Sequence, residues 1–188
     1  MTSLRADLIE RMRQADRTAF DDVIAWYAGD VIRLAAILLN DDDEARDVLQ
    51  ESMLRLVQMA KENKIRHENG SIKGLLMTTA RNLCLNRLKQ KKRFIESADE
   101  EWEDWAQFQD HHTPDRVVHE SDFMTAFQKA LNRLTPLQRV ALTLRELQGE
   151  SYRDIAQSLE LSEDGVKKQV YRALQKLRTL LEPYSGSI

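Results

Sequence analysis

Apolar residues recur at helical spacing along most of the chain. Over residues 17–39 they fall three or four positions apart, and the same spacing returns over 43–61 and 72–93. A period of about 3.6 residues predicts amphipathic helices that bury one face. A short helix is expected over 3–14, and the polar segment 62–71 is expected to be a loop. Since no strand pattern competes with this one, the predicted fold class is all-α.

The residues after Phe123 predict four more helices, over 123–133, 136–147, 151–158 and 162–181. Thr135 is expected to cap the second of these helices, with Pro136 in its first position, and Ser162 is expected to cap the fourth. The last helix carries an apolar stripe of Val166, Val170, Leu174, Leu177 and Leu181, and on its other side Lys167, Lys168, Tyr171, Arg172 and Gln175. Two short helices with cations on the second are typical of a DNA-binding helix-turn-helix. An ordinary helical domain with a solvated basic face is the alternative.

Charge divides the chain into three parts. Residues 1–95 hold 17 Lys and Arg against 14 Asp and Glu, residues 96–125 hold 1 against 10, and residues 126–188 hold 10 against 7. Two mildly basic blocks around an acidic one are typical of two nucleic-acid-binding modules on an acidic tether. The expected domains are therefore 1–95 and 123–188, joined by a linker over 96–122.

Several classes of function are not supported by the sequence. Cys84 is the single cysteine, and the four histidines lie in polar surroundings, so neither a disulfide nor a metal site is expected. No apolar run has the roughly 18 residues that a membrane span needs, so we expect no membrane insertion and a cytoplasmic protein. No nucleophile–base pair, carboxylate dyad or phosphate-binding glycine loop is visible. The chain is expected to be neither an enzyme nor dependent on a cofactor.

Two predicted helices carry polar strips opposite their buried faces. The strip on 43–61 mixes carboxylates, amides and one leucine, which suits a docking surface as well as it suits a solvated one: Asp47, Gln50, Glu51, Leu54 and Gln58. The strip on 72–93 combines amides that can read base edges with cations that can hold phosphates: Asn82, Asn86, Lys89 and Arg93. Cations near the C-terminal end of a helix also interact favourably with the helix dipole. The strip on 72–93 is therefore compatible either with nucleic-acid binding or with this purely structural role.

Three segments together resemble a bacterial sigma factor of the small, two-domain extracytoplasmic-function group. They are DEARDVLQESMLRL (43–56), SIKGLLMTTARNLCLNRLKQKKR (71–93) and LTPLQRVALTLRELQGESYRDIAQSLELSEDGVKKQVYRALQKLR (134–178). The resemblance implies a protein that binds core RNA polymerase and promoter DNA and starts transcription at defined promoters. One departure lies in the last segment, where Gly165 stands at a position at which the family tends to have Thr.

The resemblance also implies roles for individual residues. The strip on 43–61 would dock on the clamp coiled coil of the polymerase, and the start of the C-terminal domain would meet the flap. The −10 element would be melted and held by Asn69, Asn82, Asn86, Lys89 and Arg93. The −35 element would be read by Lys167, Lys168, Tyr171 and Arg172, with Arg139 and Arg153 on phosphates. An anti-sigma factor is a further partner that the resemblance implies.

Two other classes of protein compete with this interpretation. A helix-turn-helix regulator with an N-terminal sensor domain would bind its operator without polymerase, usually as a symmetric dimer. A protein that only sequesters a partner would support no promoter-specific transcription. A sigma factor differs from both, because its two domains would need polymerase to hold them at the spacing of the two promoter elements.

Overall fold

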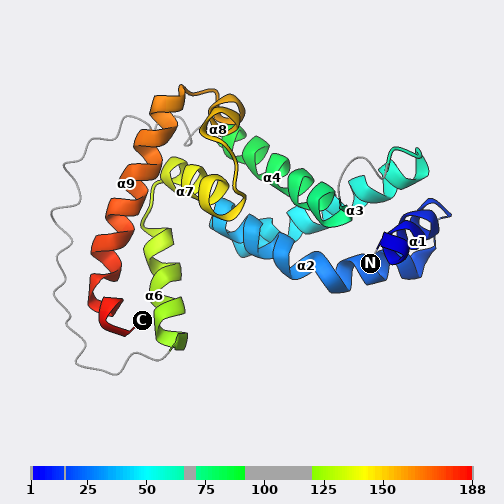
Figure 1. Ribbon diagram of the computed structural model, residues 1–188, viewed down its shortest axis with the longest axis horizontal. Coiled ribbons are helices and arrows are strands. Elements are labelled where there is room, and N and C mark those ends of the chain that lie inside the picture. Colours follow the sequence, from blue (N-terminus) through cyan, green and yellow to red (C-terminus); the bar gives the residue numbers. More distant parts are fainter. Residues whose placement is uncertain (1, 15, 66–70, 92–119, 188) are drawn as a thin grey trace. The chain divides into compact units, whose positions relative to one another are not determined.

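The computed structural model of the chain describes residues 2–14, 16–65, 71–91 and 120–187. The chain divides into two compact units, Met1–Gln90 and Lys91–Ile188. Within the described residues every regular element is a helix, and none is a strand (Figure 1). The all-α fold class is thereby confirmed.

The described residues of the N-terminal unit form four helices. They are α1 (Thr2–Arg13), α2 (Arg17–Leu39), α3 (Asp42–Lys61) and α4 (Ile72–Gln90). Helix α2 packs against α3 and α4, these two pack against each other, and α1 lies on α2 and α3. Their apolar faces meet in a core that includes Val23, Val31, Leu38, Val48, Leu56, Leu76, Ala80 and Leu83, all buried. Burial of these faces holds the helices together, as their spacing predicts.

The turn between α2 and α3 follows directly from its sequence. Asn40 ends α2 in the left-handed conformation (φ 55°), which Asn tolerates better than most residues. The carboxylate of Asp41 then accepts hydrogen bonds from the backbone N–H groups of Asp43 and Glu44, both at 3.0 Å. Asp41 is thus the N-cap of α3, and the acidic first turn of this helix favours its dipole.

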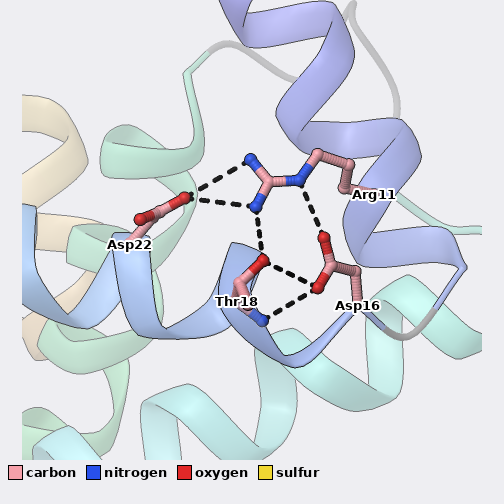
Figure 2. A network of polar contacts seen from close by, with 4 residues as sticks. All are labelled: Arg11, Asp16, Thr18 and Asp22. Carbon is pink, nitrogen blue, oxygen red and sulfur yellow. Dashed lines mark hydrogen bonds and ion pairs between the residues drawn. The ribbon is translucent and has the colours of Figure 1, made fainter.

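Arg11 joins α1 to the start of α2 (Figure 2). Its Nε donates to Asp16 at 2.8 Å, its Nη2 donates to the Thr18 hydroxyl at 2.7 Å, and both Nη atoms lie 3.3 Å from the Asp22 carboxylate. Asp16 is also the N-cap of α2, accepting from the Thr18 backbone N–H at 2.9 Å. Its hydrogen bonds with Arg11, and then with Thr18, hold the pKa of Asp16 below its usual value. The ion pair therefore fixes the angle at which the chain enters α2.

The C-terminal unit is built around one long helix. Helix α9 (Glu163–Leu181) packs against α6 (Glu120–Asn132), α7 (Pro136–Leu142) and α8 (Tyr152–Leu159), and the short η4 (Glu182–Ser187) follows it. A π-helical turn, η3 (Thr143–Leu147), continues α7. Thr135 caps α7 in a capping box with Gln138, and Pro136 occupies the first turn, as predicted.

Some predicted boundaries and buried positions differ in the structure. Helix α6 begins at Glu120, three residues before its predicted start, so residues 120–122 of the predicted linker are helical. Residues 96–119 of the predicted linker lie outside the described residues. Helix α4 is described to Gln90, three residues short of its predicted end. In the predicted apolar face of α2, Ile24 is 42% exposed. The buried face of α2 is therefore narrower than its periodicity implied.

Candidate nucleic-acid interfaces and docking face

The predicted polar strip of α3 lies on the surface of the N-terminal unit. Four of its five members are exposed and Glu51 is half-buried, while the opposite side of the helix is covered; we call the strip Asp47, Gln50, Glu51, Leu54 and Gln58 the docking face. Leu54 is 69% exposed, more than any other large apolar side chain in the described part of the chain. An exposed leucine within a polar rim is the composition expected of a surface that a partner covers.

The docking face is linked to α4 by an ion pair. One carboxylate oxygen of Glu51 accepts from Arg55 at 2.7 Å, and the other lies 3.4 Å from Nη2 of Arg87. Nη1 of Arg87 donates to the backbone carbonyl of Glu44 at 3.2 Å. Arg87 therefore ties α4 to two points of α3. Arg87 was not among the residues singled out from the sequence, and it lies outside the predicted polar strip.

The outer surface of α4 presents two amides at a four-residue interval. Asn82 and Asn86 are exposed and Lys89 is half-buried, whereas Asn69 and Arg93 lie outside the described residues. The side-chain oxygen of Asn82 accepts from Nε and Nη2 of Arg81, at 3.2 and 3.0 Å. The structure thus brings Asn82 and Asn86 onto one accessible surface of α4 with a cation beyond them.

The inner face of α4 is apolar, as its spacing predicted. The expected residues are all buried: Leu76, Ala80, Leu83, Cys84 and Leu88. Burial raises the pKa of the Cys84 thiol to about 12, which keeps it protonated and unreactive at neutral pH. No group of three His, Cys, Asp or Glu residues that could hold a metal ion occurs in the described residues.

Helices α8 and α9 form the predicted helix-turn-helix. Glu160 ends α8 in the left-handed conformation (φ 59°), and the Leu161 backbone N–H donates to the carbonyl of Ala156 at 3.0 Å. The Ser162 hydroxyl then caps α9 by accepting from the Gly165 backbone N–H at 3.0 Å. The two helices share a buried core of Ile155, Ala156, Leu159, Val166 and Val170. The tight turn fixes the angle between α8 and α9.

The predicted DNA-contacting residues of this motif are accessible. Lys167, Lys168 and Arg153 are exposed, Tyr171 is 62% exposed, and Arg172 is half-buried. Leu174, expected in the buried stripe, is instead 46% exposed, and Ala173 is buried in its place. The stripe steps by three residues after Val170, not by four, in a helix against which α6, α7 and α8 all pack. A helix with cations and a tyrosine along its free face has the features of a major-groove reader.

Arg139 contradicts one prediction. Its side chain lies on α7 and is 4% exposed, and its Nε is buried without a hydrogen-bond partner among the described residues. Desolvation by this burial lowers the pKa of Arg139. A phosphate cannot reach a side chain in this position, so Arg139 is removed from the candidate contacts. The run Val140–Leu144, which contains no charge, was the available signal that the end of α7 is buried.

Known proteins resemble the chain along most of its length. The family descriptions "Sigma-70 region 2" and "Sigma-70, region 4" match residues 23–94 and 124–177. The chain is 28% identical over 173 residues to ECF RNA polymerase sigma factor SigE of Mycolicibacterium smegmatis, covering 92% of the chain and 65% of that protein. It is 27% identical over 188 residues to the RNA polymerase sigma-H factor of Pseudomonas aeruginosa, covering 94% of the chain and 93% of that protein.

One solved structure agrees with the helical architecture. It is the sigma factor RpoE in complex with the anti-sigma factor NepR from Bartonella quintana, which is 24% identical. The similarity has a TM-score of 0.53 and covers 87% of the chain and 96% of that chain, and it shows the fold. Among the described residues, no helix is both long and apolar enough to cross a membrane. Both sigma-70 regions occur in order along this chain, and the SigE and sigma-H relatives match it along more than nine-tenths of its length. The chain therefore belongs to the sigma-70 family of RNA polymerase sigma factors, in its extracytoplasmic-function group.

Proposed function

We propose that this protein is a sigma factor that joins core RNA polymerase and directs transcription from promoters with matching −35 and −10 elements. One observation carries the proposal: the two sigma-70 regions fall in separate compact units, and each unit exposes side chains suited to nucleic acid. The N-terminal unit would act on the −10 element, and the C-terminal unit would read the −35 element. Polymerase and promoter DNA place this activity in the cytoplasm.

In the C-terminal unit, α9 would enter the major groove at the −35 element. Lysine and arginine donate to the O6 and N7 atoms of guanine and to phosphates. Lys167, Lys168, Tyr171 and Arg172 are the proposed contacts of α9, and Arg153 on α8 would hold a phosphate. Their exposure supports this assignment. The cations supply affinity for any DNA, so sequence preference has to come from the few side chains that meet base edges.

In the N-terminal unit, α4 and the preceding loop would open the −10 element. Asn82 and Asn86 are the proposed base contacts, Asn69 is a further candidate, and Lys89 and Arg93 would hold the backbone. Unstacking a base costs a few kcal/mol, which a protein recovers by binding the base that it has captured. This process breaks no covalent bond and needs no catalytic side chain, so we propose that the protein is not an enzyme.

Two protein partners follow from the same proposal. The docking face would bind the clamp coiled coil of the polymerase, with Leu54 at its centre and the amides and carboxylates around it. The start of the C-terminal unit would meet the flap. We also expect regulation by an anti-sigma factor, because the sigma factor of Bartonella quintana with this fold was solved in complex with one.

The proposal is tested by transcription from a library of promoters. Core polymerase is mixed with the full-length protein, and the 5′ ends of the transcripts are sequenced. We expect discrete start sites that share two upstream elements about two helical turns of DNA apart. A matched double variant, N82A/N86A, should lose preference in the downstream element alone. Transcripts that begin at the same sites without the protein would refute the proposed function.

A further inference from the structure

Asp164 begins the free face of α9, although it was not among the predicted DNA contacts. The buried side of the helix is formed by Val166, Val170, Ala173 and Leu177. Positions three, four and seven residues apart share one face of a helix. Asp164 lies four residues before Lys168 and seven before Tyr171, both exposed, and its own side chain is 92% exposed. It is thus the first member of the row that faces outward along α9.

Neither residue next to Asp164 in the sequence belongs to this outward row. Glu163 lies one residue before Asp164, which turns it about 100° away from Asp164 around the helix axis. It also lies three residues before the buried Val166, so it belongs to the flank of α9 next to the buried side. Gly165 has no side chain, and a Cβ placed there would lie 3.1 Å from the Ser162 hydroxyl. Because that hydroxyl already caps the helix, Asp164 is not needed as a cap. In the first turn of α9, Asp164 therefore begins the outward row, while Glu163, also exposed, lies on the flank.

Asp164 is paired with a proposed DNA contact. Its carboxylate lies 3.1 Å from the ammonium group of Lys167, and this hydrogen bond raises the pKa of Lys167. Exposed ion pairs of this kind are weak, so DNA can replace either partner. The pair offers an acceptor oxygen beside a donor nitrogen. In the major groove a C·G base pair offers the reverse, the N4 donor of cytosine beside the O6 and N7 acceptors of guanine.

We propose that Asp164 is a specificity-determining residue of the −35 reader, accepting a hydrogen bond from cytosine N4 while Lys167 donates to guanine. The inference rests on the proposed function of α9. A carboxylate near DNA is repelled by phosphates and loses water on binding, so it disfavours every sequence that offers it no donor. Asp164 would therefore act mainly by excluding promoters that lack cytosine at one position.

The test uses holoenzyme made from core polymerase and full-length protein, with promoters randomised across the −35 element. Transcripts are sequenced for the wild type, D164A, D164N and the control E163Q, which removes the same charge from the same turn on another side of the helix. The wild type is expected to prefer cytosine at one position by about 5- to 10-fold. D164A should lose that preference, D164N should transfer it to adenine, since asparagine pairs with adenine N6 and N7, and E163Q should keep it.

Three results separate the possible explanations. Equal stimulation of all −35 sequences by D164A would show that Asp164 only repels DNA, and would overturn the inference. The same profile from E163Q and D164N would overturn it too, because general charge in the first turn would then explain both. A wild-type holoenzyme that ignores the −35 sequence altogether would instead overturn the proposed function of α9.

Discussion

Replacing Leu54 by alanine should weaken binding to core polymerase without weakening the fold. Complete burial of a leucine side chain contributes about 1.5–3 kcal/mol. Leu54 is 69% exposed in the free protein. If docking covers that exposed fraction, its loss costs about 1–2 kcal/mol, which corresponds to about 5- to 30-fold weaker binding. Since the side chain makes little contact within the unit, the free energy of unfolding should hardly change.

Leu56, two residues further along α3, provides the matched control. It is 2% exposed and points into the core, so L56A should cost about 2–5 kcal/mol of stability. Binding is measured by competition of unlabelled variants with labelled wild-type protein for core polymerase, and stability by urea unfolding. The two variants should give opposite patterns. An L54A protein that competes as well as the wild type would refute the assignment of the docking face.

Three further predictions concern stability, reactivity and Arg139. The hydrogen bonds with Arg11 and Thr18 lower the pKa of Asp16, so at neutral pH the wild type should resist urea better than D16N. This difference in stability should shrink as the pH falls below about 4 and disappear once Asp16 is protonated in the folded protein. A difference that persists at pH 2 would contradict the prediction. Cys84 should react with a thiol reagent at pH 8 only as fast as the protein opens, so reaction at the rate of a free thiol in the native protein would be inconsistent with its burial. R139M should unfold at the same or higher urea concentration than the wild type, because Nε of Arg139 is buried without a hydrogen-bond partner among the described residues, which is costly. Its holoenzyme should keep the −35 preference; loss of that preference in folded R139M would restore Arg139 as a DNA contact.

Helix ends were the most predictable part of this fold. Asn40 and Asp41, Thr135 with Pro136, and Ser162 act through local backbone hydrogen bonds, so their effects depend on few distant residues. The buried face of α4 was equally clear, because its apolar residues repeat at a spacing that only a helix brings together. Local chemistry thus determined the helix ends that carry a cap.

Positions that depend on how helices meet were less predictable. The spacing of α9 allowed either Leu174 or Ala173 to be buried, and contact with α6 and α7 decides in favour of Ala173. Arg139 was taken for a surface cation because its charge outweighed the apolar run that follows it. The π-helical turn at Thr143–Leu147 has no distinct sequence signal and was included in one long helix. In each case the deciding contact comes from another part of the chain.

For the proposed DNA contacts, the sequence predicted which side chains of α9 would be exposed. Lys167, Lys168 and Tyr171 are exposed as expected, since charge and aromatic character on a helix opposite an apolar stripe are visible in the sequence. Asp164 was not among the predicted contacts, because an acidic first turn is ordinarily explained by the helix dipole. Its helical register with Lys168 and Tyr171 was the signal that could have revealed it.

Promoter binding with and without core polymerase distinguishes a sigma factor from a free-standing regulator most directly. Labelled promoter DNA is titrated with the full-length protein alone, with core polymerase alone, and with both together. We predict specific binding at sub-micromolar concentration only for the mixture, because each unit alone contacts too short an element. Tight, sequence-specific binding by the protein alone, unchanged when core polymerase is added, would contradict its assignment as a sigma factor.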